Sequence, residues 1–139
     1  MILSFALTGR PLRGKSGMKT TRTGRHYPDA EWAAQRDAWV LVVKAAARKQ
    51  YNGAAANGWT IKPLPFSCAV KLSGMIRFPD KRVADLDGVI GALGHVLERA
   101  GIIQNDKQIV SVAMTISALG TPATAGIWCQ VETEFLRPV

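Results

Sequence analysis

Cysteine is scarce in this chain of 139 residues, which has two, Cys68 and Cys129, far apart and without a CxxC pair or a histidine-rich stretch beside them. This scarcity argues against a disulfide-stabilised fold and against a structural zinc site, so we expect free thiols in a reducing cytoplasm. No apolar run approaches the roughly 20 residues of a membrane-spanning helix, and we expect no membrane partner. Residues 2 to 8 are apolar but lack a basic segment before them, which predicts a strand rather than a signal peptide.

Acidic residues are few as well, ten against eighteen lysines and arginines, for a net charge of +8. The first 50 residues hold ten of the bases and three of the acids, and residues 10 to 25 contain no acid. Such a segment favours polyanions, because each phosphate that it neutralises releases condensed counterions. The alternative is a solubilising surface. The candidate DNA-contacting bases of this segment are Arg10, Arg13, Lys15, Lys19, Arg22 and Arg25.

The composition, 47% hydrophobic and 20% charged, is typical of a globular protein, and 139 residues form one ordinary domain. The element order is predicted to be β-α-β-α-β-β, an α/β (α+β) fold in which two helices cover a small mixed sheet. Residues 10 to 25 show no apolar period and are expected to form a basic loop. Strands are expected at residues 2–8, 66–78, 107–119 and 127–136, and helices at residues 30–50 and 86–100.

Both helices are predicted from apolar residues at helical spacing. In the first, after Asp29 as N-cap, Trp32, Trp39 and Val42 are among the apolar positions, and the Asn-Gly pair at residues 52–53 is expected to end the helix. The four tryptophans are candidate base-stacking platforms, but Trp32 and Trp39 share a helical face, which favours core packing. The second helix is expected to bury one apolar face: Leu86, Val89, Ile90, Leu93, Val96 and Leu97.

Three of the few acids lie around this second helix. Asp85 and Asp87 stand at its start, and Asp106 opens the strand that follows it. Separately, they are explained as a helix cap, a first-turn carboxylate and a loop residue. A strand returning beside the helix would instead bring Asp106 near the pair, and three converging carboxylates need a hard cation between them. Mg²⁺, with Mn²⁺ as an alternative ion, is the expected metal.

Two stretches resemble a known family, the RusA-type Holliday-junction resolvases. The first is ADLDGVIGALGHVLERAGIIQND, residues 84–106, preceded by Lys81 and Arg82 and followed by Gln108 and two aliphatic residues. The second is GRHYPDAEWAAQRDAWV, residues 24–40, which matches the family's GR-x-Y and the helix after it. Together with the flanking residues they cover about a third of the chain in the family's order.

The resemblance implies a homodimeric, Mg²⁺-dependent endonuclease that resolves four-way or branched DNA junctions by paired phosphodiester hydrolysis, in a bacterial or phage-infected cytoplasm. By position, Asp85, Asp87 and Asp106 would hold the metal and catalyse. Lys81, Arg82 and Lys107 would join the basic segment in contacting DNA. All 139 residues would then form one RusA-like domain.

The family's lysine, four residues after the second aspartate, is replaced by Gly91. His95, one helical turn further along, is a candidate catalytic replacement, and Lys19 and Lys107 are other candidate cations. The replacement also supports an alternative function, a junction-binding relative with weakened or absent cleavage. A third alternative is a basic domain that binds protein partners and uses its acids as helix caps.

Overall fold

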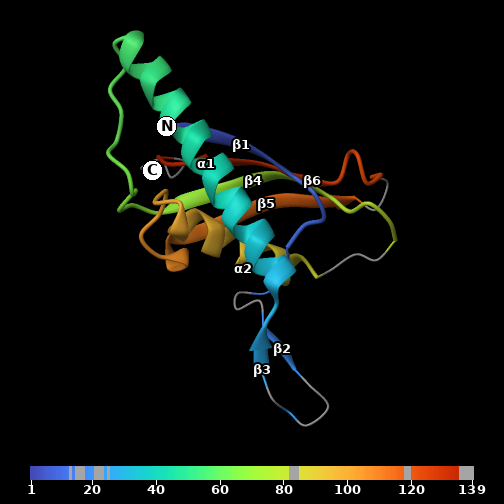
Figure 1. Ribbon diagram of the computed structural model, residues 1–139. Helices are drawn as coiled ribbons and strands as arrows, with labels where there is room; N and C mark the ends of the chain where they lie inside the picture. The colour runs from blue at the N-terminus through green and yellow to red at the C-terminus, as the bar shows by residue number, and fades with distance from the viewer. Residues whose placement is uncertain are drawn as a thin grey trace.

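The computed structural model describes residues 1–12, 14, 18–20, 24, 26–81, 85–117 and 120–134. Its centre is a four-stranded mixed sheet in the order β1-β6-β4-β5 (Figure 1). The pairs β1–β6 and β6–β4 are antiparallel, and β4–β5 is parallel. The strands are β1 (Ile2–Thr8), β4 (Val70–Arg77), β5 (Ile109–Ser117) and β6 (Gly126–Glu132), and the helices are α1 (Ala30–Ala56) and α2 (Leu86–Arg99). The predicted α+β class and the order of these elements are confirmed.

The core lies between the two helices and one face of the sheet. Alternate residues of β1, Leu3, Phe5 and Leu7, are buried, while their neighbours on the other face are exposed or half-buried. They join α1 residues such as Trp39 and α2 residues such as Leu93 in one hydrophobic cluster. Because every second residue of a strand points to the same side, this alternation leaves the opposite face of the sheet without a helical cover.

The first helix is longer than its sequence predicts. Asp29 caps it as expected, since its side chain accepts from the backbone N–H groups of Glu31 and Trp32. The helix then continues through the Asn-Gly pair at residues 52–53 to Ala56, so the predicted end was wrong. One glycine costs a helix only about 1 kcal/mol, and the alanines after it are strong helix formers. Val42, one of the apolar positions at helical spacing, is 43% exposed.

The second helix largely matches its prediction. Val89, Leu93, Val96 and Leu97 are buried, and Leu86, at its first position, is 37% exposed. Asp85 occupies the N-cap position, but its side chain makes no capping hydrogen bond, so this carboxylate is not used to satisfy the helix terminus.

A short hairpin interrupts the segment expected to be a loop. Strands β2 (Met18–Thr20) and β3 (His26–Pro28) pair antiparallel, with Lys19 opposite Tyr27. The hairpin projects from the body of the protein, away from the sheet (Figure 1). The partner strand lies outside the 10–25 segment, and neither strand has an apolar period, so periodicity could not reveal the pairing.

No helix in the described part of the chain is long and apolar enough to cross a membrane. Cys68 and Cys129 are both free thiols, and burial raises the pKa of Cys129 to about 12.

Candidate functional site

Asp85 and Asp87 stand exposed at the N-terminal end of α2. Asp85 is extended, with φ −62° and ψ 142°, and Asp87 lies in the first helical turn. The positive end of the helix dipole favours carboxylates at this place. Two exposed carboxylates this close in sequence have the oxygen chemistry that Mg²⁺ selects, since this ion is commonly held by one or two carboxylates together with water and substrate phosphate.

Asp106 lies beside the middle of α2, at the start of the 3-10 helix η1 (Asp106–Gln108). Its backbone N–H donates to a carboxylate oxygen of Glu98. A Cβ built on Gly94 would lie 3.3 Å from the Cβ of Asp106. The missing side chain of Gly94 therefore lets the loop that carries Asp106 approach the helix closely.

Asp87 and Gly94, which Asp106 contacts, lie along one face of α2. Asp87, Gly91, Gly94 and Glu98 follow at spacings of 4, 3 and 4, so they share a face of the helix. Gly94, the residue that Asp106 touches, follows Asp87 by seven positions, which corresponds to about 10 Å along the axis. Gly91 lies between them and places no side chain in the gap.

The described residues, which include all three aspartates, contain no group of three or more His, Cys, Asp or Glu side chains that could hold a metal ion. The chain by itself thus places Asp106 on the same side of α2 as Asp87 without joining it to the N-terminal pair in one cage. Of the predicted metal ligands, Asp85 and Asp87 are the two whose positions fit a carboxylate-and-phosphate site for Mg²⁺.

The basic segment is attached to the same end of α2. The N–H of Gly14 donates to the carbonyl of Gly88 at 3.0 Å, which ties this segment to the turn that carries Asp87. Arg10 forms an ion pair with Asp80 at 2.6 Å, and its carbonyl accepts from the side chain of Gln35. The start of the segment is therefore fixed between α1 and the approach to α2.

The structure describes only some of the other residues that were predicted to contact DNA. Lys81, just before α2, and Lys107, beside Asp106, are exposed. Lys19 lies in β2, where the structure describes its backbone. Arg13, Lys15, Arg22, Arg25 and Arg82 lie outside the described residues.

His95 faces α1 and is half-buried, with its ring centroid 6.2 Å from that of Trp32. Burial lowers the pKa of His95, and the nearby Arg36 and Arg99 lower it further, while Glu98 and Asp106 act in the opposite direction. The ring is therefore neutral at neutral pH. A neutral imidazole supplies no positive charge to this site, although it can accept a proton.

The segment that presents Asp106 is held by hydrogen bonds from Gln108. Its side-chain nitrogen donates to the carbonyls of Phe66 and Cys68 at 2.6 and 2.9 Å. Its side-chain oxygen accepts from the N–H groups of Gln104 and Asn105 at 2.7 and 2.9 Å. Asn105 caps η1 by accepting from the N–H of Lys107. Hydrogen bonds within the fold therefore account for both Asn105 and Gln108.

Sequence reasoning missed Glu98 and Gly94 as parts of this site. Glu98 follows His95 by three residues and thus shares its helical face, a spacing that could have indicated it. The close approach at Gly94 carried no such signal, because it depends on a loop twelve residues further along the chain.

No protein-family model matches this chain, and no curated protein matches it either. Its function is therefore inferred from its own residues and their arrangement.

Proposed function

We propose that this protein is a metal-dependent endonuclease that cuts branched DNA, with the four-way junction as substrate. The observation that supports this most directly is the hydrogen bond from Gly14 to Gly88. It attaches a segment with six bases and no acid to the turn of α2 that holds Asp87. A DNA backbone drawn to the basic segment would pass next to exposed carboxylates, which by themselves repel phosphate.

The chemistry requires a cation between the carboxylates and the DNA. Bound Mg²⁺ would supply activation of a water molecule and polarisation of the scissile phosphate. Asp85 and Asp87 would hold the ion from the helix terminus, while Lys81 would neutralise a neighbouring phosphate. Asp106 and Glu98 would accept hydrogen bonds along the same helical face and orient water there.

Paired cuts across a symmetric junction require two sites, so the proposed functional unit is a C2 homodimer. The proposal places the protein in the cytoplasm of a bacterial host or of a phage-infected cell, where its two free thiols would stay reduced.

A second candidate is a junction-binding relative that does not cleave. Two observations favour it: Gly91 leaves no side-chain cation between Asp87 and Asp106, and the lowered pKa of His95 keeps that ring uncharged. A positive group aimed at the attacked phosphate commonly contributes strongly to phosphodiester cleavage.

The test is cleavage of a labelled synthetic four-way junction in Mg²⁺, in Mn²⁺ and in chelator. We expect metal-dependent paired nicks that disappear in Asp87→Asn and persist in Asp37→Asn, an exposed acid on α1. Asp87→Asn should bind the junction in chelator at least as tightly as the wild type, because one repulsive charge is removed. Tight binding with no nicks in either metal would favour the second candidate. Affinity that does not respond to salt would exclude both.

A further inference from the structure

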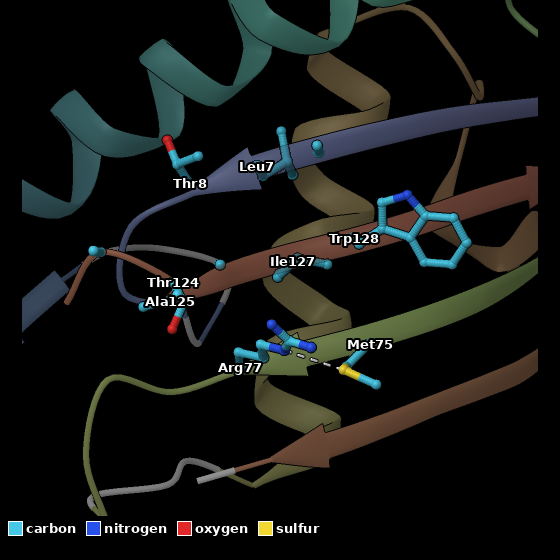
Figure 2. A pocket seen from close by; sticks show the side chains of 11 residues that line it. Leu7, Thr8, Met75, Arg77, Thr124, Ala125, Ile127 and Trp128 are labelled. Atoms are coloured by element: carbon cyan, nitrogen blue, oxygen red, sulfur yellow. Dashed lines mark hydrogen bonds between the residues drawn. The ribbon is translucent and has the colours of Figure 1, made fainter. Parts of the chain in front are cut away.

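The uncovered face of the sheet carries a tryptophan at its centre. Trp128 of β6 is 51% exposed, between Met75 of β4, which is 38% exposed, and Ala6 of β1, its partners in the strand register. Figure 2 shows Trp128, Met75 and Arg77 on the side of the strands turned away from α2. The indole therefore presents an aromatic surface to solvent from a central, rigid strand.

A hollow of about 410 Å³ lies beside the indole, at the end of the sheet where β6 begins. Its lining includes Thr8, Met75, Arg77, Gly126 and Trp128. Gly126 stands in register between Thr8 and Arg77, with φ +155°, and a Cβ there would lie 2.1 Å from the carbonyl oxygen of Leu7. The position thus excludes other residues, because a side chain there would meet the backbone of β1.

Arg77 provides a positive charge at this hollow. Its Nε donates to the sulfur of Met75 at 3.3 Å, and it forms no ion pair with a carboxylate among the described residues. The acid on this face, Glu132, stands opposite Lys71 at the far end of β4, six residues from Arg77. The guanidinium is therefore available to an anion that enters the hollow.

We propose that this face binds an unpaired strand of DNA, with one base stacked on Trp128 and an adjoining phosphate on Arg77. Stacking on an exposed indole tolerates any base, and a guanidinium recognises phosphate without reading sequence. The choice of DNA as the strand rests on the proposed function, in which opened branch points expose unpaired bases.

The polar character of this face argues for a strand rather than for a second copy of the chain. Beside the exposed Ile2, Met75 and Trp128, its outward residues include the polar Ser4, Thr8, Ser73, Gln130 and Thr115. Permanent homodimer interfaces are more apolar than ordinary protein surface and are depleted of charge at their centre. A phosphate backbone, in contrast, is bound by hydroxyl donors and by cations, which on this face are Lys71 and Arg77.

The test measures binding of a short fluorescent oligothymidylate, which cannot pair with itself, by anisotropy in chelator. Trp128→Thr should weaken binding roughly 5- to 100-fold, the usual effect of losing one base–aromatic stack, and Trp128→Phe should restore much of it. The control is Trp59→Thr, which removes a 71% exposed tryptophan from the segment after α1 and should leave binding unchanged. Circular dichroism and urea unfolding check that each variant is folded.

Two further arms locate the contacts. Arg77→Gln should lower the salt dependence of the affinity by about one phosphate contact, whereas Arg48→Gln, an exposed base on α1, should not. A strand that carries a photoreactive halogenated uracil should cross-link to the peptide containing Trp128. Equal affinities of Trp128→Thr and Trp59→Thr, with cross-links elsewhere, would overturn the proposal.

Other occupants give distinct results. If thymidine monophosphate bound as tightly as the oligonucleotide, the hollow would be a small-molecule site and the strand proposal would be wrong. If Trp128→Thr turned a dimer into monomers without changing affinity for the strand, a second copy would cover this face. Strand binding that depends on Trp128 without any junction nicking would leave this inference standing while the nuclease proposal failed, and the opposite pattern would do the reverse.

Discussion

At the scale of single residues, the absence of a side chain is decisive at two positions of α2. Gly94 lets Asp106 pack against the helix, and Gly91 places no side chain between Asp106 and Asp87. Glycine weakens a helix by about 1 kcal/mol relative to alanine. At Gly94 that cost is offset by a tertiary contact that a larger residue would disturb.

Substitutions of the buried Gly94 in α2 and of the exposed Gly53 in α1 should therefore change stability in opposite directions. Gly94→Val would place carbon atoms where Asp106 and the side chain of Ile109 are already within 3.3 Å, and we expect a loss of about 1–3 kcal/mol of unfolding free energy. Gly53→Ala, in α1 with no neighbour within 4 Å, should gain about 0.5–1 kcal/mol. Urea unfolding measures both. Equal stability of the two variants would contradict the close approach at Gly94.

His95 should make stability fall in mild acid. Its pKa is lowered in the folded state by burial and by Arg36 and Arg99, so the folded protein binds the proton less well than the unfolded chain. Above the ordinary pKa of about 6.5 the ring is neutral in both the folded and the unfolded chain, so it costs no stability. Stability is lost as the pH falls from there through the lowered pKa of the folded state.

The measurement is the urea midpoint of the wild type and of His95→Gln across this pH window. The variant should show a flatter profile, and the imidazole signals of His95 should titrate below those of a model peptide. An unchanged profile in His95→Gln would mean that other groups, such as Glu98 or Asp106, dominate the acid response.

At the scale of elements, the position of Asp106 depends on how η1 is tied to the chain before β4. Gln108 connects these segments through four hydrogen bonds, two as donor and two as acceptor. A side chain that bridges two loops restricts both, so the site's geometry depends on a residue without a chemical role of its own.

Replacing Gln108 with alanine should cost about 2 kcal/mol of unfolding free energy, because partly buried carbonyls lose their donors. The freed loop should also expose Cys68, whose carbonyl accepts from Gln108. Faster reaction of this thiol with a disulfide reagent is the second readout. Gln104→Ala is the matched control, since the bond at that position uses the backbone N–H; an equal effect there would contradict the bridging role.

At the scale of the whole molecule, the proposed DNA contacts lie on two different surfaces. The β2–β3 hairpin projects from one end of α1, whereas the open sheet carries Trp128 and Arg77 (Figures 1 and 2). A duplex arm held by the first surface and an unpaired strand held by the second would together favour branched DNA over linear duplex. Affinity gained from two linked contacts can greatly exceed that of either alone.

Removing exposed bases near the acidic residues should reduce junction affinity and its salt dependence together. In Lys81→Gln with Lys107→Gln, the slope of log K against log salt should become less steep by about two phosphate contacts. Arg48→Gln with Lys49→Gln, two exposed bases on α1, is the control of equal charge. Titrations of a labelled junction at several salt concentrations provide the comparison, and equal slopes for the two double variants would show that α2 is not near the DNA.

The sequence by itself determined the elements whose signals are local. The apolar face of α2, the cap at Asp29, the strand at residues 2–8 and the basic segment of residues 10 to 25 all follow from spacing and composition, because each depends on neighbours within a few residues. The order of strands and helices followed from the same signals.

Tertiary structure decided what distant segments do to one another. The contact of Asp106 with Gly94, the attachment of Gly14 to Gly88 and the pairing of β2 with β3 join residues whose one-dimensional patterns carry no trace of the partner. The exposure of Trp128 depends likewise on both helices packing on the other face of the sheet. Burial and pairing are properties of the assembled chain, so these features became visible when its elements were placed in space.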